Sequence, residues 1–288
     1  MKEGTVTVPG GRIWYGIEGT SRATPLILIH GGPGSPHPYL SPHAALAAER
    51  PVIFYDQLGC GNSERPDNRA LWRLPRFVDE LGALTAALHL DRFHVLGHSW
   101  GSIVAVEFFR SRRDGVASLV LASPVLSFPR YAAHVEKLRG KLSAENRAAL
   151  DHAEARGEFG SPEAQLATME FYSRHFCRRD PWPECLLETL AGFGRQTYET
   201  MQGPAEFAVT GNLKRYDCTS RLGSIDAPTL ITCGRHDLSD PQAALADHRA
   251  IPGSEIAIFE QSSHTPHLEE TAAYLDVLRD FLARTEAG

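Results

Sequence analysis

The chain has 288 residues, of which 42% are hydrophobic and 22% charged, and its formal net charge is −6. This length and composition suit one large α/β domain, or a core domain with a smaller inserted one. No run of five like charges occurs in the sequence, so nothing indicates nucleic acid or a membrane as a partner.

The N-terminal residues run straight into an alternating Thr-Val segment, with no apolar leader and no stretch long enough to span a bilayer. The five cysteines are irregularly spaced and include no C-x-x-C pair, which is typical of a reducing compartment. These patterns favour a cytoplasmic protein. The thirteen histidines show neither H-E-x-x-H nor zinc-type pairing with cysteine, so we expect no metal. The glycine-rich segment 30–34 lacks the G-x-G-x-x-G spacing and no G-x-x-x-x-G-K-S/T motif occurs, so we expect no organic cofactor either. Six of them are expected at the surface or in loops: His37, His43, His134, His152, His175 and His248.

The predicted secondary structure begins with a hairpin and continues as strand-helix alternation. Residues 5–8 and 12–17 alternate in polarity around a Pro-Gly-Gly turn, which is typical of an antiparallel hairpin. Continuously apolar segments, as expected of parallel strands covered on both faces, follow at 25–29, 51–55, 93–96, 117–122, 228–233 and 255–259. Helical patterns lie between them at 37–49, 76–89, 100–112, 241–250 and 267–284. The alternation predicts an α/β fold with a mostly parallel, doubly wound sheet.

This alternation stops between residues 127 and 220, where helical patterns succeed one another without a convincing strand. The patterns cover residues 132–142, 143–156, 162–177 and 183–195. We interpret residues 127–220 as a helical cap inserted in a core domain made of residues 1–126 and 221–288. Since it leaves after one strand and returns before the next, we expect it over the carboxyl edge of the sheet, where open α/β folds bind ligands. The alternative is that these residues form a helical subdomain with a purely structural role.

A serine stands on a predicted strand-to-helix turn. Residues 97–101 read Gly-His-Ser-Trp-Gly, directly after one apolar segment and at the start of a helical pattern. A side chain at the tip of so sharp a bend needs small neighbours at two positions, because the strand and the helix almost touch there. Ser99 is therefore the candidate nucleophile.

A serine hydroxyl needs a base within hydrogen-bond reach and an acid that holds this base in the right tautomer. Asp237 and His264 each lie just past the end of a predicted strand, in the order Ser, Asp, His expected of an α/β-hydrolase. His236, Asp240 and His267 compete for these roles. We prefer the first pair, because Asp240 precedes a proline as helix caps do, and because His267 opens the last helix.

Acyl transfer also needs hydrogen-bond donors for the oxyanion that develops in the reaction. One donor is expected to be the backbone N–H of Trp100, which follows the nucleophile. The other should come from the loop after segment 25–29, which reads His30-Gly31-Gly32-Pro33-Gly34. Glycines let this backbone turn an amide inward with no side chain in the way, and we choose Gly32.

Four segments of the chain resemble the proline iminopeptidases, which are serine peptidases of the α/β-hydrolase fold. They are HGGPG at 30–34, DQLGCGNS at 56–63, GHSWG at 97–101 and QGPAEF at 202–207. The resemblance spans almost the whole chain. It implies the triad Ser99, Asp237 and His264, oxyanion donors at Gly32 and Trp100, and a helical cap over about residues 127–220, all in agreement with the assignments from the residues themselves.

The resemblance also implies how a substrate is held. Members of this family remove an N-terminal residue, and acidic cap residues are thought to bind its free amine; Glu206 matches the glutamate of the family's Gly-Pro-x-Glu-Phe segment. Many members carry a second glutamate directly after the catalytic aspartate, whereas this chain has Leu238. The amine clamp therefore has one carboxylate in place of two, which puts strict proline specificity in doubt.

These patterns lead to a hypothesis and its rivals. We expect a serine hydrolase that cleaves the amide after an N-terminal residue, with a small molecule or short peptide bearing a free amine as substrate. An aminoacyl-group hydrolase acting on a small metabolite is one alternative, and an esterase or lactonase of the same fold is another. A non-catalytic receptor on a hydrolase scaffold would be expected to lack a triad residue, and the sequence has all three.

Overall fold

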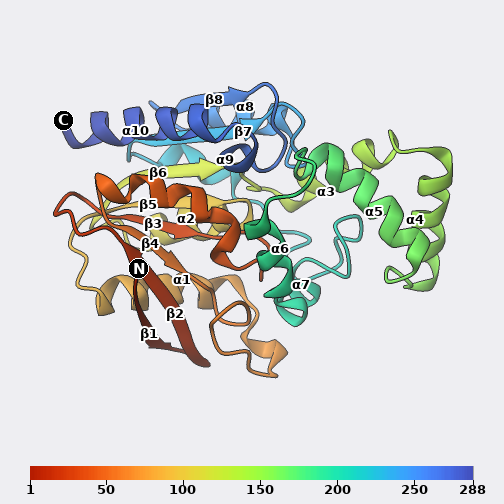
Figure 1. The fold of residues 1–288 in the computed structure, drawn as a ribbon, viewed down its shortest axis with the longest axis horizontal. Helices are drawn as coiled ribbons and strands as arrows, with labels where there is room; N and C mark the ends of the chain where they lie inside the picture. The colour runs from red at the N-terminus through yellow and green to blue at the C-terminus, as the bar shows by residue number, and fades with distance from the viewer. Residues whose placement is uncertain (288) are drawn as a thin grey trace.

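The computed structural model describes residues 1–287, and its centre is one eight-stranded sheet in the order β1-β2-β4-β3-β5-β6-β7-β8 (Figure 1). β1 and β2 form an antiparallel hairpin, β2 also runs antiparallel to β4, and all other neighbours are parallel. The strands are β1 (Lys2–Val8), β2 (Gly11–Glu18), β3 (Leu26–Ile29), β4 (Val52–Tyr55), β5 (Phe93–His98), β6 (Val116–Ala122), β7 (Thr229–Gly234) and β8 (Glu255–Phe259). The predicted fold class is confirmed.

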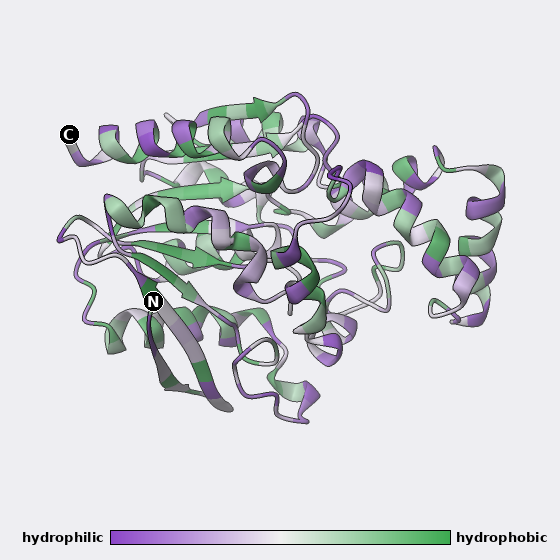
Figure 2. Ribbon diagram, in the orientation of Figure 1, coloured by the Kyte–Doolittle hydropathy of each residue, from purple (hydrophilic) through white to green (hydrophobic). Residues whose placement is uncertain are grey.

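Both faces of the sheet are covered, which explains why the central strands are apolar throughout. In β3, Ile27 and Ile29 point into one hydrophobic core while Leu26 and Leu28 point into the other. The first core lies under α1 (Leu74–Ala87), α2 (Trp100–Ser111) and α8 (Pro241–Ala250), and the second under η1 (His37–Ala48) and α10 (Thr271–Ala287). Figure 2 shows the central strands as a hydrophobic band, whereas α10 alternates between hydrophobic and hydrophilic stripes.

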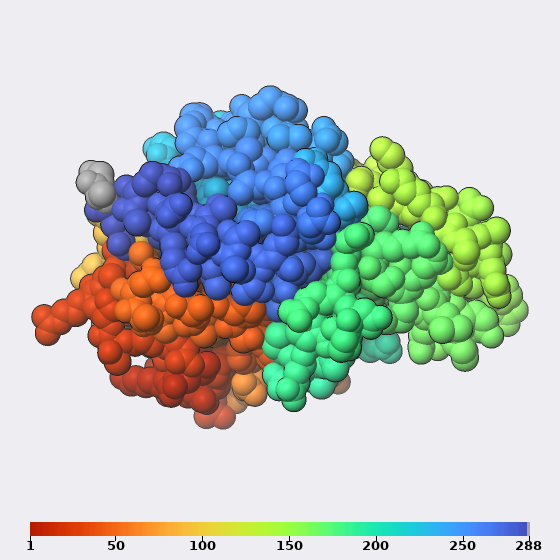
Figure 3. Space-filling model, turned by 45° about the horizontal axis from the view of Figure 1, so that its top comes forward, coloured from red at the N-terminus to blue at the C-terminus, as the bar shows by residue number. Residues whose placement is uncertain are grey.

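Five helices follow one another between β6 and β7. They are α3 (Phe128–Arg139), α4 (Ala144–Arg156), α5 (Pro162–His175), α6 (Glu184–Ala191) and α7 (Arg195–Met201). α6 packs on η1, while α4 and α5 pack on each other and project away from the sheet (Figures 1 and 3). The remaining short elements are η2 (Arg69–Leu71), η3 (Thr219–Ser224) and α9 (Pro266–Glu269). Within residues 1–287, no helix is both long and apolar enough to cross a membrane.

The structure differs from the predicted elements in three helical regions. The segment expected as a helix at 37–49 is a 3-10 helix with Pro42 inside, because proline lacks the N–H that an α-helical turn needs. The segment at 267–284 divides at Glu270 into α9 and α10. α7 was not predicted at all, since its seven residues are too few to show a periodic pattern.

One histidine expected at the surface or in a loop is in the interior. His43 is fully buried against the second core, where its Nδ1 lies 2.8 Å from the carbonyl of Leu40. Burial lowers the pKa of His43 to about 4, so the imidazole is neutral at physiological pH. Its ring packs edge-on against the ring of Tyr274, a contact between distant segments that the local sequence does not reveal.

Candidate active site

Ser99 occupies the turn between β5 and α2. Its backbone, with φ 54° and ψ −119°, has a conformation that residues other than glycine rarely adopt. The two glycines of the pentapeptide explain how this turn can form. A Cβ on Gly97 would lie 2.3 Å from the carbonyl oxygen of Gly101, and one on Gly101 would lie 2.3 Å from that of Ile29. The close approach of strand and helix leaves the half-buried Ser99 at the tip of the turn.

Asp237 and His264 lie together behind this turn, on the loops after β7 and β8. Nδ1 of His264 is 2.7 Å from Oδ1 of Asp237, which also accepts hydrogen bonds from the amide and hydroxyl of Ser239 at 2.8 and 2.9 Å. Burial alone would raise the pKa of Asp237, but the adjacent His264 and the hydrogen bonds from His264 and Ser239 hold this pKa below its usual value. The carboxylate is therefore ionised and fixes Nδ1 as the protonated ring nitrogen.

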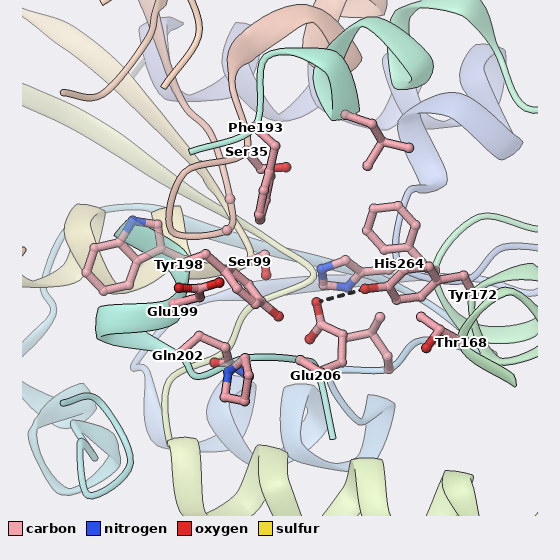
Figure 4. Close-up of a pocket in the computed structure, with 18 of the residues that line it drawn as sticks. Ser35, Ser99, Thr168, Tyr172, Phe193, Tyr198, Glu199, Gln202, Glu206 and His264 are labelled. Carbon is pink, nitrogen blue, oxygen red and sulfur yellow. Dashed lines mark hydrogen bonds between the residues drawn. The ribbon is translucent and has the colours of Figure 1, made fainter. Parts of the chain in front are cut away.

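Ser99 and His264 line one cavity of about 530 Å³. Figure 4 shows the imidazole of His264 turned toward the Ser99 hydroxyl. No hydrogen bond joins these two side chains among residues 1–287, and such contacts commonly tighten only when a substrate binds. The structure thus brings Ser99, Asp237 and His264 to one place, with the free Nε2 of the imidazole available to the serine.

The two expected oxyanion donors border the same cavity. Trp100 is the first residue of α2, and the first amides of a helix have no carbonyl partner within that helix. Gly32 has φ +110°, and a Cβ there would lie 2.5 Å from the amide nitrogen of Gly34, so the loop conformation requires glycine. The backbones of Gly32 and Trp100 thus both lie beside Ser99, the candidate nucleophile.

Gln57 connects these two donor segments, a role that the sequence analysis did not assign. Its amide N–H donates to Nε2 of His30 at 2.9 Å, and its side-chain Nε2 donates to the carbonyl of His30 at 2.9 Å. Its Oε1 accepts from the indole N–H of Trp100 at 2.9 Å. The joint presence of HGGPG, DQLGCG and GHSWG in the sequence was the available signal, because Gln57 hydrogen-bonds to residues of both other motifs.

Glu206 reaches the cavity from the segment after α7 and is half-buried. The hydroxyl of Tyr131 on α3 donates to its Oε2. The hydroxyl of Tyr172 on α5 donates to its Oε1 at 3.5 Å (Figure 4). Tyr198 on α7 lines the cavity beside them. Burial and the nearby carboxylate raise the pKa of all three tyrosines well above the usual range, so all three stay protonated. Tyr131 and Tyr172 donate to Glu206, whereas the hydroxyl of Tyr198 has no hydrogen-bond partner among the described residues. Sequence reasoning missed this group, which we call the tyrosine cradle (Tyr131, Tyr172 and Tyr198).

The competing residues lie elsewhere or do other work. Asp240 caps α8, accepting from the amide of Gln242 at 3.0 Å, as its position before a proline predicted. His267 is fully buried on α9 and packs on the ring of Tyr39.

Leu238, which stands next to Asp237, lines the cavity with 3% of its surface exposed. No group of three or more potential metal ligands occurs within residues 1–287.

The sheet topology and the serine turn define an α/β-hydrolase, and a family model described as the alpha/beta hydrolase fold matches residues 24–271. A proline iminopeptidase of Heyndrickxia coagulans is 41% identical over 97% of this chain and 98% of its own length. The crystal structure of proline iminopeptidase from Mycobacterium smegmatis matches with a TM-score of 0.91 at 36% identity, covering 99% of both chains. The crystal structure of VinJ matches with a TM-score of 0.95 at 33% identity, again over 99% of both chains.

The chain therefore belongs to the proline iminopeptidase family of α/β-hydrolases. It is an enzyme, a serine hydrolase of an aminopeptidase family. The expected fold and the expected family are both confirmed.

Proposed function

We propose that this enzyme hydrolyses the amide bond after an N-terminal residue that carries a free amine, through an acyl-enzyme on Ser99. The observation that carries the proposal is the convergence of two groups on one cavity. Ser99 and His264, which is hydrogen-bonded to Asp237, border it from the sheet, and Glu206 with the tyrosine cradle borders it from the inserted segment.

The proposed reaction has two halves. Oγ of Ser99 attacks the carbonyl carbon while Nε2 of His264 takes the hydroxyl proton, and Asp237 stabilises the resulting imidazolium. The backbone N–H groups of Gly32 and Trp100 donate to the oxyanion. The carbon–nitrogen bond then breaks as His264 returns the proton to the leaving amine. Water, deprotonated by His264, cleaves the acyl-enzyme ester and releases the N-terminal residue.

Glu206 is proposed to bind the α-ammonium group of the substrate. A carboxylate that faces a partly desolvated ammonium makes a charge-assisted contact, which an N-acylated substrate cannot make. The hydroxyls of Tyr131 and Tyr172 hold this carboxylate in place. The name shared by the curated relatives suggests proline as the N-terminal residue, and Leu238 supports a wider range of residues than proline alone.

We propose further that residues 127–220 form a cap domain over a core made of residues 1–126 and 221–288. The cap places Tyr131, Tyr172 and Glu206 opposite the loops of the sheet.

The five cysteines, all of them free thiols, support our expectation of a reducing, cytoplasmic compartment.

A second candidate function is the hydrolysis of an aminoacyl group from a larger, less peptide-like amine. A cavity of about 530 Å³ is in the range that holds ligands much larger than one amino acid. Its wall includes Phe159, Leu238, and two apolar side chains that are about half exposed, Met169 at 47% and Leu190 at 46%. Kinetics on aminoacyl amides of increasingly large apolar amines would favour this function if kcat/KM rose with amine size.

The Ser99→Ala variant tests the proposed function. It should abolish turnover of prolyl and alanyl p-nitroanilides, lowering kcat by about a millionfold, because it removes the atom that forms the acyl-enzyme. Ser111→Ala, at the other end of α2 and outside the cavity, is the matched control and should keep full activity. Near-full activity of the Ser99→Ala variant, with its circular dichroism unchanged, would contradict the mechanism.

Covalent labelling separates the enzyme from a receptor of the same fold. A fluorophosphonate should label the parent protein at Ser99, because only an activated serine reacts. A parent protein that binds aminoacyl amides but is neither labelled nor active would be a receptor.

A further inference from the structure

A buried chain of hydrogen bonds links three of the loops that border the cavity. The backbone N–H of Gly31 donates to the hydroxyl of Tyr39 at 2.8 Å. That hydroxyl lies 2.8 Å from Nδ1 of His98, whose Nε2 is 2.9 Å from the carbonyl oxygen of His264. Tyr39 and His98 are each 2% exposed. The chain therefore joins the glycine loop after β3, the serine turn after β5 and the histidine loop after β8.

The positions of the protons along this chain follow from the groups at its ends. The N–H of Gly31 can only donate, so the oxygen of Tyr39 accepts and its own hydrogen points to Nδ1 of His98. The carbonyl of His264 can only accept, so Nε2 of His98 carries the hydrogen. The neutral Nε2–H form of His98 satisfies every member of the chain.

The surroundings keep His98 in this neutral form. Burial, and then the neighbouring His264, lower the pKa of His98 to about 3. The titratable groups around the His98 ring are Tyr39, His43, Asp237, His264 and His267. The chain therefore keeps one arrangement of its protons over the pH range in which a serine hydrolase works.

Packing around Gly31 shows how closely the glycine loop is fitted to this chain. A Cβ on Gly31 would lie 3.2 Å from Cβ of Ser99, 3.2 Å from the hydroxyl of Tyr39 and 3.3 Å from Nδ1 of His98. Gly31 also precedes Gly32, whose amide is the proposed oxyanion donor. The contact between Gly31 and Tyr39 thus fixes the backbone next to that amide.

The second arm of the chain acts on the proposed general base. Asp237 holds the ring of His264 at Nδ1, and His98 holds the backbone of His264 at its carbonyl. With one contact on its ring and one on its backbone, His264 has little freedom to turn away from Ser99. The amide of Tyr39 also donates to Thr189 on α6 at 2.9 Å, which connects the chain to the inserted helices.

We propose that Tyr39 and His98 are positioning residues for the reaction. They hold the backbone of Gly31 and Gly32 and the backbone of His264 in fixed positions relative to Ser99. This inference rests on the proposed function, because it concerns the geometry of the same acyl transfer. Neither residue touches the reacting atoms. Both act on alignment, which matters most in the transition state, so their loss should lower kcat and leave KM nearly unchanged.

Tyr39→Phe is the first test, since it removes one oxygen atom and keeps the ring. The variant should lose about tenfold in kcat and in the rate of fluorophosphonate labelling, with KM within about twofold of the parent value. Tyr55→Phe is the matched control, because Tyr55 is buried and its hydroxyl has no hydrogen-bond partner among the described residues. It should leave kcat unchanged. Equal kcat values for the parent, Tyr39→Phe and Tyr55→Phe would overturn the proposal.

Two variants of His98 separate positioning from simple packing. His98→Gln keeps a donor near the position of Nε2 and should retain about ten times the kcat of His98→Ala, when both are compared at equal folded fraction. Equal kcat values for these two variants would count against the arm that reaches His264.

A spectroscopic measurement tests the chain without reference to activity. The ¹⁵N spectrum of the imidazoles in the parent protein should show His98 as a neutral Nε2–H tautomer that does not titrate between about pH 5 and 9. A different tautomer of His98 would overturn the proposed chain of hydrogen bonds and leave the proposed function standing. Absence of both turnover and labelling in the parent would overturn the proposed function, and the positioning role with it.

Discussion

Two regions meet at one cavity but are built in different ways: the loops after β5, β7 and β8, and the segment between β6 and β7, which we call the helical wall. Ser99, Asp237 and His264 each follow the end of a strand. Asp237 and His264 are hydrogen-bonded to each other between two loops, and the carbonyl of His264 lies 2.9 Å from Nε2 of His98. Glu206 is half-buried and is held by hydroxyls from α3 and α5, which are far apart in the sequence. In the proposed mechanism, the first region fixes the reacting atoms, whereas the second fixes one charge.

Because the two regions are built differently, bond cleavage and selectivity for a free amine can change separately. Bond cleavage requires alignment within a fraction of an ångström, and strands packed on both faces provide it. In the proposed function, selectivity for a free amine depends on the single charge of Glu206, so the segments that carry it could vary while the reaction is kept. Leu238 belongs to both regions, since it directly follows Asp237 and lines the cavity.

Among the residues that hold the reacting groups in place, the largest effect is expected at Asp237, and a small effect there would contradict the contrast between the two regions. Asp237→Asn should lower kcat by about 10⁴-fold, because the amide no longer holds His264 in the productive tautomer. Asp240→Asn is the matched control three residues later, and asparagine is as good a helix cap as aspartate. Steady-state kinetics on an aminoacyl p-nitroanilide decide the outcome. Similar losses in both variants would show that the loop as a whole matters and that the carboxylate of Asp237 does not.

A smaller effect, on stability, is expected from the neutral histidines buried in the core. Because the pKa of His43 is about 4 in the folded protein and about 6.5 when unfolded, the unfolded state binds more protons between these values. The free energy of unfolding should therefore fall as the pH falls through this window. Urea unfolding at about pH 7.5 and 5.5 should differ by about 1.4 kcal/mol less in His43→Asn than in the parent.

The control for this measurement is a histidine of the inserted helices. His152 is exposed on α4, so His152→Asn should leave the pH dependence of the unfolding free energy as it is in the parent. If His152→Asn flattened the dependence as much as His43→Asn did, the acid sensitivity would not lie in the core.

The smallest effect is expected in the tyrosine cradle. Tyr172→Phe removes one donor to Glu206, while Tyr131 still holds the carboxylate. Its kcat/KM on free-amine substrates should fall by about two- to fivefold, the amount expected for one modest hydrogen bond. Hydrolysis of an N-acylated ester by the same variant should stay at the parent rate. A loss of equal size on both substrates would assign Tyr172 to the general shape of the cavity.

The sheet and the residues on its loops were predictable because local pattern and topology determine them. Two alternating segments and six continuously apolar ones predicted all eight strands to within three residues at each end. Parallel strands bring their carboxyl ends to one edge, so residues that follow β5, β7 and β8 had to lie close together. This reasoning found Asp237 and His264, and the geometry places their side chains 2.7 Å apart.

The helical wall and the buried polar contacts could not be predicted in the same way. Tyr131, Tyr172 and Tyr198 lie on three helices, and nothing in their local sequence shows that they face one carboxylate. Tyr39 and His98 are hydrogen-bonded across 59 positions of the chain. Such contacts depend on how elements pack, which neither periodicity nor spacing records. The resemblance to a family supplied Glu206 but not the residues that hold it.

The most direct test of the account compares free-amine and N-acylated substrates in the parent enzyme and in Glu206→Gln. The ratio of their kcat/KM values measures selectivity, while the rate on the N-acylated ester measures the reaction itself. Glu206→Gln should lower this ratio by about tenfold or more and leave the rate on the ester unchanged. Equal losses on both substrates would contradict the division between a reacting region and a selecting one.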